Sequence, residues 1–330
     1  MQRLMTLFLM AALATMAQAG ESVYPGNPAR FQQALFVTTD GLSRFDPDSG
    51  RAVWRVLEGM HLYEPVVKRD VVFVGSTGGL HAVDGESGKI RWHHAYAGPV
   101  FSPVLNGEVL YLAGQDGVLR SLLAASGELL WQAKPGAGWV YPPVVEEGLV
   151  VTGGQDGVIW AMDAASGEIA WQRRLDNELV YRPLLTDRGS LVVTSFGGDV
   201  VALDLLTGDE RWRNRYPTPI SVTSMTSSGV ALGSLDGSLR LLDTSTGGLI
   251  WEHALGDRLV MPAVEHRGKL MAVIGDGRYR ILATDSGSTL QHGRLGGDPL
   301  AGTFVSDNEA LFFYRNRNNP VAASVSLNVN

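Results

Sequence analysis

The sequence predicts an all-β fold in which one small unit of four antiparallel strands is repeated around a closed ring. Two observations predict it. A motif of the form Asp-x-x-Ser/Thr-Gly-x-x-x-Trp recurs along most of the chain, and short apolar runs alternate with glycine-containing turns without any helical period. The length of 330 residues therefore reflects the number of repeated units in one domain, and not the presence of several domains.

The motif is the most regular feature of the chain. It ends at Trp54, Trp92, Trp131, Trp171, Trp212 and Trp251, at spacings of 38, 39, 40, 41 and 39 residues. A seventh, degraded copy keeps Ser286 and Gly287 but has Ala283 in place of Asp and Gln291 in place of Trp, and the third copy also lacks the Asp. A period this steady indicates one structural unit that is repeated.

Each repeat predicts the same four short strands. In the third repeat they cover residues 101–108, 109–114, 118–123 and 129–134. The turn between the second and third strands is Asp40-Gly41, Gly78-Gly79, Asp116-Gly117, Asp156-Gly157, Gly197-Gly198, Asp236-Gly237 or Asp276-Gly277. These dipeptides suit hairpin turns with positive φ. Four-stranded antiparallel sheets repeated about every forty residues are typical of a β-propeller.

The two ends of the chain decide the number of blades. Residues 27–37 align without gaps on residues 64–74, so seven complete units run from about Pro28 to about Arg294. Three more strands follow, at Gly302–Val305, Ala310–Tyr314 and Val321–Val325, and Glu21–Tyr24 is expected to supply a fourth. The prediction is eight blades, with N- and C-terminal strands closing the ring; seven blades with a C-terminal extension is the alternative.

Composition and the N-terminus predict where the protein works. Residues 1–19 contain Arg3, an apolar run and the sequence Ala17-Gln18-Ala19, which is typical of a cleaved signal peptide. We therefore expect an exported, soluble propeller domain over residues 20–330. The chain has no cysteine, which excludes disulfides and thiolate metal sites, and its net charge of −7 without basic runs disfavours nucleic acid and anionic membranes.

The tryptophan repeat resembles the docking repeat of the PQQ-like (quinoprotein-type) β-propeller family, in particular its non-catalytic BamB-like branch of outer-membrane protein assembly factors. The resemblance covers nearly the whole mature chain. It implies a periplasmic scaffold for protein–protein interactions, with envelope proteins such as the outer-membrane β-barrel assembly machinery as partners. It also implies that the six motif tryptophans dock one blade on the next. The missing lipidation cysteine departs from the branch and predicts no lipid anchor, and no membrane span is expected.

Enzymatic activity is not expected. Quinoprotein dehydrogenases hold PQQ and a metal ion at the propeller axis, and they typically have adjacent cysteines and long inserted loops, which this chain lacks. His93 and His94 are adjacent on a strand, so their side chains point to opposite faces and cannot converge on one metal ion. The sequence therefore predicts no catalytic, cofactor-binding or metal-binding residues. A PQQ- or metal-binding propeller and a divergent quinoprotein dehydrogenase are the alternatives.

One further repeated position predicts an interaction site. At the start of the innermost strand the repeats carry Tyr63, Phe101, Tyr141, Tyr181, Val222 and Met261. Radial symmetry places these residues around the axis or on the rim of one face. One interpretation is packing between blades. The other is an asymmetric partner-binding rim, since exposed Tyr, Trp and Arg are enriched in binding hot spots. That rim consists of Tyr63, Phe101, Tyr141, Tyr181, Arg182 and Met261, with His61 and Trp139 close by in sequence.

Overall fold

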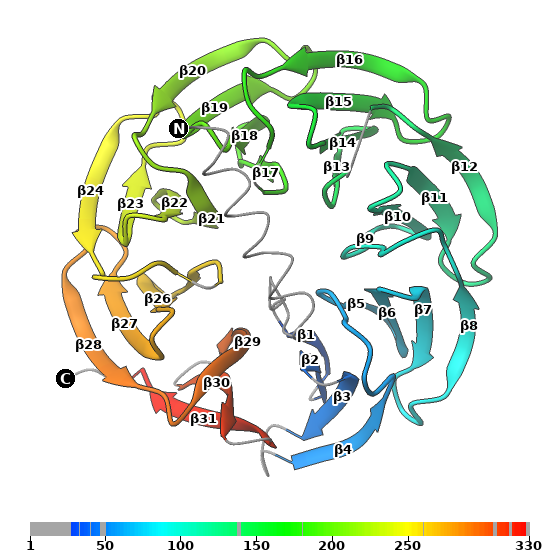
Figure 1. Cartoon of the computed structure of the whole chain (residues 1–330), viewed down its shortest axis with the longest axis horizontal. Helices are drawn as coiled ribbons and strands as arrows, with labels where there is room; N and C mark the ends of the chain where they lie inside the picture. The colour runs from blue at the N-terminus through cyan, green and yellow to red at the C-terminus, as the bar shows by residue number, and fades with distance from the viewer. Residues whose placement is uncertain are drawn as a thin grey trace.

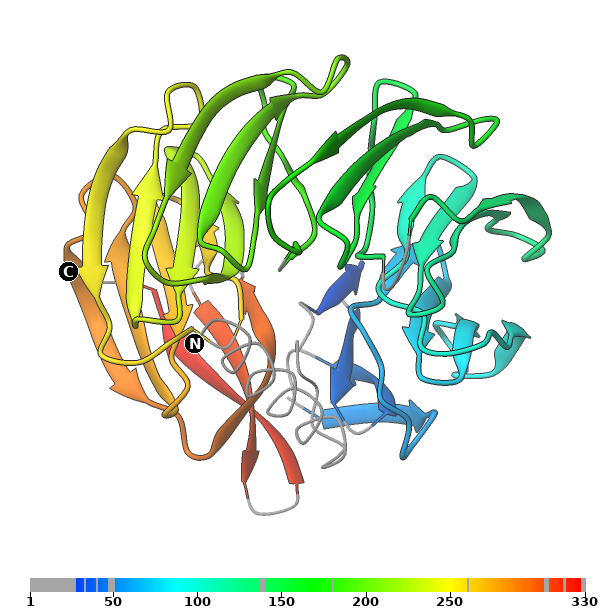
Figure 2. The same ribbon diagram turned by 45° about the horizontal axis from the view of Figure 1, so that its top comes forward.

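A computed structural model describes residues 28–327, apart from residues 33, 40, 47–50, 137–139, 180, 260, 306–308 and 317–318. The described residues form eight antiparallel sheets arranged as a ring around one axis (Figure 1). Seven sheets have four strands and the last has three. Seen obliquely, the sheets stand side by side around the axis (Figure 2). The described part of the chain contains no helix with the length and apolar character of a membrane span.

The first four blades follow the sequence order. Their strands are β1 (Ala29–Phe31), β2 (Ala34–Thr39), β3 (Gly41–Asp46) and β4 (Arg51–Val56); β5 (Val66–Lys68), β6 (Val71–Ser76), β7 (Gly79–Asp84) and β8 (Ile90–His94); β9 (Val104–Asn106), β10 (Val109–Ala113), β11 (Leu119–Leu123) and β12 (Leu129–Ala133); and β13 (Val144–Glu146), β14 (Leu149–Gly153), β15 (Val158–Asp163) and β16 (Ile169–Arg174).

The remaining sheets continue around the ring. Their strands are β17 (Leu184–Leu185), β18 (Ser190–Thr194), β19 (Asp199–Asp204) and β20 (Glu210–Arg215); β21 (Ile220–Thr226), β22 (Gly229–Ser234), β23 (Ser238–Leu242) and β24 (Leu249–Ala254); β25 (Val264–His266), β26 (Lys269–Val273), β27 (Arg278–Ala283) and β28 (Thr289–Arg294); and the three-stranded sheet β29 (Asp298–Val305), β30 (Glu309–Asn316) and β31 (Asn319–Ser326).

The blade count differs from the expected eight. The described chain has seven four-stranded blades, and the sheet that follows them has three strands. Its first strand, β29, contacts β25 of the seventh blade and β2 of the first, so this sheet lies in the ring between them. The three C-terminal strands occur where the sequence predicted them. Glu21–Tyr24, the expected fourth strand, and the predicted signal peptide lie outside the described residues.

The hydrophobic core is a series of layers between neighbouring blades. The two central strands of each blade are almost completely buried; β22, for example, has no exposed residue. Seven apolar clusters fill the seams from the first blade to the three-stranded sheet, and each cluster combines side chains of two adjacent sheets. Because both faces of a blade are apolar, each blade depends on its neighbours for burial.

A β-bulge lies beside the motif tryptophan in each of the six blades that have one. In the fourth blade Ala161 pairs with Trp171, and the register shifts directly after this pair, between Ala161 and Met162. All seven four-stranded blades have such a shift between their third and fourth strands. A bulge increases the local twist and re-aims nearby side chains, and here the indole is directed toward the following blade.

Each motif tryptophan packs against the glycine of the next motif. The indole N–H of Trp171 donates to the carbonyl of Leu205 at 2.9 Å, and that of Trp251 donates to Thr284 at 2.8 Å. A Cβ added to Gly208 would lie 2.6 Å from the Trp171 ring, and one added to Gly287 would lie 2.6 Å from the Trp251 ring. Only glycine leaves room for an indole this close to the turn.

The contact explains the degraded seventh motif. Gly287 is retained because it receives Trp251 of the blade before it. Gln291 can replace Trp because no Ser-Gly or Thr-Gly turn follows Gly287 in the sequence, so an indole there would have no equivalent seat.

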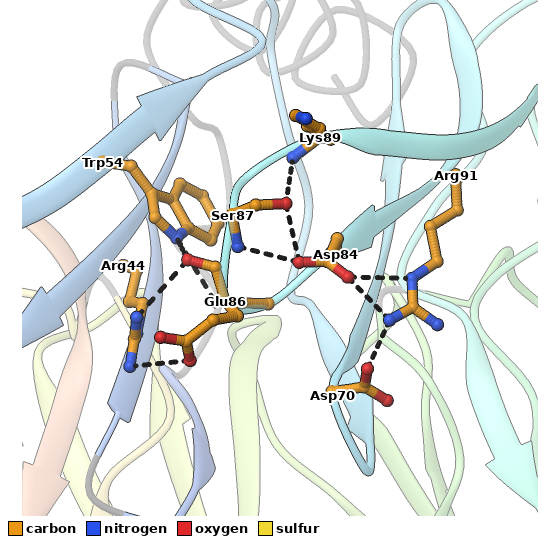
Figure 3. A network of polar contacts seen from close by, with 9 residues as sticks. Arg44, Trp54, Asp70, Asp84, Glu86, Ser87, Lys89 and Arg91 are labelled. Carbon is orange, nitrogen blue, oxygen red and sulfur yellow. Dashed lines mark hydrogen bonds and ion pairs between the residues drawn. The ribbon is translucent and has the colours of Figure 1, made fainter.

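The Asp of the motif holds the same turn in shape, as the second blade shows (Figure 3). The Asp84 carboxylate accepts hydrogen bonds from the backbone N–H and the hydroxyl of Ser87, at 2.8 and 2.7 Å, and from Arg91. These hydrogen bonds hold the pKa of Asp84 well below its usual range. Trp54 of the preceding blade donates to the carbonyls of Gly85 and Glu86 in this turn. The motif therefore stabilises the turn and also forms the surface on which the indole of the preceding blade packs.

Candidate interaction site near the propeller axis

The repeated inner position lies just after a residue that joins two blades. The Val100 N–H of the third blade donates to Ser76 of the second at 3.0 Å, and Val140 donates to Gly114 in the same way at 3.3 Å. Val100 and Val140 are almost completely buried. The following residues, Phe101 and Tyr141, are only partly buried. Because side chains alternate along an extended chain, the first residue enters the seam and the next lies beside it.

Three rings of the second and third blades contact one another. His61 and Tyr63 have ring centroids 5.1 Å apart, and Tyr63 and Phe101 have centroids 5.1 Å apart with planes at 80°. Edge-to-face pairs of this kind add to the stability of an aromatic cluster. Burial raises the pKa of Tyr63 to about 12 and lowers the pKa of His61. Both side chains are therefore uncharged at neutral pH.

An ion pair connects two blades that are not neighbours in the ring. Arg182, two residues before β17 of the fifth blade, lies 3.5 Å from Glu64, two residues before β5 of the second. The two side chains keep 29% and 25% of their accessible surface, so solvent or a partner reaches both. Burial opposes the charge of Arg182, but Glu64 and Tyr181 outweigh it and raise the pKa of Arg182. The guanidinium of Arg182 is therefore charged at neutral pH.

The structure corrects one member of the predicted rim. Met261 retains 1% of its accessible surface and packs with Met271, Tyr279 and Phe312 in the seam between the seventh blade and the three-stranded sheet. It is a core residue, because the aliphatic side chain continues the seam cluster of its blade. Val222, at the same position in the sixth blade, is 3% exposed. Trp139 lies outside the described residues.

The other rim residues belong to four consecutive blades. Tyr63, Phe101, Tyr141 and Tyr181 are all partly buried, and Arg182 follows the last of them. Tyr141 also packs against the core cluster between the fourth and fifth blades. The two interpretations of this position therefore apply to different blades: packing in the sixth and seventh, and a partly exposed aromatic series in the second to fifth.

A pocket of about 550 Å³ was not predicted from the sequence. It lies between the fourth and fifth blades and is lined by Asp156, Arg174, Asp176, Asn177, Glu178 and Phe196, together with Gln155 and Leu175. Burial raises the pKa of Glu178. The linker that forms its wall, residues 175–178, leads along the chain to Tyr181 and Arg182. The two acidic residues of this linker, Asp176 and Glu178, are the feature of the sequence from which a polar pocket here could have been predicted.

A histidine pair in the second blade was also not predicted from the sequence. His93 pairs across strands with His81, and the two rings stack with centroids 4.3 Å apart. His81 is 3% exposed, and its Nε2 lies 3.0 Å from the Ser76 hydroxyl. Burial, and secondarily His93, lowers the pKa of His81 to about 4. As predicted for adjacent strand residues, His94 does not join them; its ring contacts Trp92 and Tyr96.

The inner position fits bound PQQ poorly. PQQ carries several carboxylates, which need cationic or hydrogen-bonding partners. The residues that follow the six inner positions are Glu64, Ser102, Pro142, Arg182, Thr223 and Pro262, which include one cation, and Arg182 is already paired with Glu64. Among the described residues, no group of three or more His, Asp or Glu side chains is placed to hold a metal ion.

Comparisons with known proteins bear on this architecture. A PQQ-repeat family model described as outer membrane protein assembly factor BamB matches residues 39–137. Over this segment the chain resembles the PQQ-repeat family and BamB. The matched segment runs from the first blade through the third and includes Tyr63 and Phe101.

Solved structures extend the similarity to nearly the whole chain. BamB from Moraxella catarrhalis has a TM-score of 0.73 and 19% identity, over 90% of this chain and 95% of that chain. The computationally designed Ika8 protein has a TM-score of 0.79 and 13% identity, over 92% and 96%. At these identities the likeness is one of fold. No curated protein matches the chain significantly.

Proposed function

We propose that this BamB-like propeller is a non-catalytic scaffold of the bacterial envelope that binds other proteins through the face carrying the aromatic series. The observation that carries the proposal is the partly exposed series Tyr63, Phe101, Tyr141 and Tyr181 beside the ion pair of Arg182 and Glu64. Aromatic rings and arginine in a partly desolvated setting are the side chains enriched in binding hot spots. The neighbouring pocket would accommodate a protruding side chain of the partner.

The repeat itself supports binding rather than chemistry. Linkers and turns stay nearly constant in length from blade to blade, so no inserted loop encloses a substrate cavity. The likeness to BamB supports outer-membrane protein assembly as the process, and the N-terminal sequence supports the periplasm as the location. The proposed partners are envelope proteins, the outer-membrane β-barrel assembly machinery first among them.

Site-specific photocrosslinking tests this proposal. A photoreactive phenylalanine at position 181 of the exported protein should crosslink envelope proteins in living cells, and mass spectrometry should identify barrel-assembly subunits among them. Position 206 is the matched control. Leu206 is 62% exposed and lies in the turn between β19 and β20. Because the strands of a meander alternate in direction, that turn is at the opposite end of the blade from Tyr181.

The outcomes separate the parts of the proposal. Crosslinks to barrel-assembly subunits from position 181 and not from position 206 support both the face and the process. Crosslinks to a different envelope complex from position 181 support the scaffold and overturn the process. Equal crosslinking from both positions overturns the assignment of the face.

A further inference from the structure

The pocket between the fourth and fifth blades has a fixed wall. In the linker from β16 to β17, Leu175 and Leu179 are 3% and 1% exposed and belong to the core cluster between these blades. The Leu175 N–H donates to the carbonyl of Gly157 in the fourth blade at 2.8 Å. The Glu178 carbonyl accepts a hydrogen bond from the N–H of Phe196 in the fifth blade at 2.8 Å. The residues between the two leucines are therefore attached to both blades.

The second of these hydrogen bonds recurs in other linkers, which allows the blades to be compared. Its acceptors are His61, Pro99, Glu178, Pro219 and Arg258, and its donors are Thr77, Gln115, Phe196, Leu235 and Gly275. Of the described linkers that make this bond, only the one between the fourth and fifth blades has a carboxylate at the acceptor and an aromatic ring at the donor. The linker between the sixth and seventh blades has Arg258 and Gly275 in these places. The acid and the ring are therefore departures from the repeat, which does not need them to fold.

Glu178 is a carboxylate without a compensating cation. It is partly buried, and burial raises its pKa. Among the described residues, no side chain or backbone group donates a hydrogen bond to its carboxylate or forms an ion pair with it. Arg174, which also lines the pocket, donates instead to the backbone carbonyl of Asp156 at 2.7 Å. Because an unpaired charge is costly to bury, a cation brought to Glu178 would offset that cost.

The rest of the lining also favours a cationic group. Three carboxylates, those of Asp156, Asp176 and Glu178, line the pocket together with the single guanidinium of Arg174. The partly exposed ring of Phe196 lines it too. The face of an aromatic ring attracts ammonium and guanidinium groups. A carboxylate and an aromatic ring in one pocket are therefore suited to a basic side chain, whereas an anionic group would meet an excess of negative charge.

We infer that this pocket binds a basic side chain of the partner protein, arginine in preference to lysine. The inference deepens the proposed function and rests on it for the source of the side chain. A volume of about 550 Å³ leaves room for a whole long side chain. The preference for arginine follows from its planar guanidinium, which can stack on an aromatic ring and form two parallel hydrogen bonds with a carboxylate. The ammonium of lysine is a more strongly hydrated point charge.

Peptide titration followed by amide NMR tests the inference on the mature protein, residues 20–330. The probe is a pentapeptide, Gly-Ser-Arg-Ser-Gly, blocked at both ends. It should shift the amide signals of residues 176–178 and 196 in a saturable way. The control peptide has citrulline, which is neutral and nearly the same shape, in place of arginine, and it should cause no such shifts. The lysine peptide should bind about threefold more weakly than the arginine peptide.

Variants chosen from the repeat separate the acid from the ring. Glu178→Gln should weaken binding of the arginine peptide about tenfold. Glu178→Arg, which installs the kind of residue that Arg258 provides in the later linker, should abolish it. Phe196→Leu, which installs the residue type found at Leu235, should remove the preference for arginine over lysine. Glu168→Gln, at an exposed position in the β15–β16 turn of the fourth blade, should leave the affinity unchanged.

Four results would overturn the inference. They are absence of arginine-peptide binding, equal binding of the citrulline peptide, unchanged affinity in Glu178→Gln, and tighter binding of free spermidine than of the arginine peptide at these residues. The last result would make a small polyamine the occupant. The titration uses no partner and does not involve position 181. Peptide binding without crosslinks from position 181 would therefore overturn the proposed face alone, and crosslinks without peptide binding would overturn the pocket alone.

Discussion

The seams between blades and the inner ends of the blades are built from the same repeat, but they vary in different ways. At the seams the same contact recurs from blade to blade, with an indole lying against the motif glycine of the next blade. At the inner ends the corresponding residue is a partly exposed ring in four blades and a buried aliphatic side chain in two others. The constant positions hold the ring together. The position that departs from the repeat is the one at which we propose that a partner binds.

The largest effect should come from breaking a seam. Trp251 is 8% exposed and donates to Thr284 of the next blade. Trp251→Ala removes the ring and its hydrogen bond and should lower the free energy of unfolding by about 3–5 kcal/mol. Chemical denaturation of the mature protein measures the loss. A loss below about 1 kcal/mol would contradict a structural role for the seam.

Two glycines with similar backbone conformations allow the contact with the indole to be measured separately from backbone strain. Gly287 has φ of +67° and touches Trp251, whereas Gly268 has φ of +72° and open space around it. Alanine costs backbone strain at both positions, about 1–2 kcal/mol. Only at position 287 does it also collide with the ring, so the total loss for Gly287→Ala should be roughly 2–4 kcal/mol. Equal losses in the two variants would show that the ring tolerates a Cβ at its seat.

The pair of His81 and His93 occurs in one blade only among the described residues. It predicts that the stability of the folded protein falls at acidic pH. The pKa of His81 is about 4 in the folded protein, below its ordinary value of 6.5. Between these values the unfolded chain binds a proton that the folded protein does not. Stability therefore falls as the pH drops from about 6.5 to 4, by about 2 kcal/mol between pH 7 and 5. His81→Gln should remove most of this loss, measured by denaturation at both pH values. An unchanged pH profile in the variant would contradict it.

The sequence predicted the constant features well and the variable ones incompletely. Periodicity predicted the strands, the turns and the tryptophan positions, because these contacts repeat in every unit. It could not separate Met261 from Tyr181, since the burial of each depends on the neighbouring blade. The pairing of His81 with His93 was missed because they are separated by twelve residues and meet only through strand register. The pocket likewise requires two blades.

The smallest effect on stability should come from the ion pair near the axis. Arg182 and Glu64 keep about a quarter of their surface exposed. Such pairs contribute about 1 kcal/mol or less, so Arg182→Gln should change the free energy of unfolding by no more than that. Partner binding should nevertheless weaken, because the proposed interface includes the partly exposed guanidinium. A large loss of stability in this variant would place the pair among the structural contacts.

The most direct test of the comparison measures stability and partner retention together in the variants Tyr141→Ala and Tyr181→Ala. Each purified variant would be denatured in parallel with affinity capture of envelope proteins. The account predicts a loss of unfolding free energy well below that of Trp251→Ala, smallest for Tyr181→Ala, and clear loss of the captured partner, while Leu206→Ala retains both properties. Destabilisation as large as that of Trp251→Ala, with partner binding intact, would show that the inner rings are core and that the protein binds elsewhere.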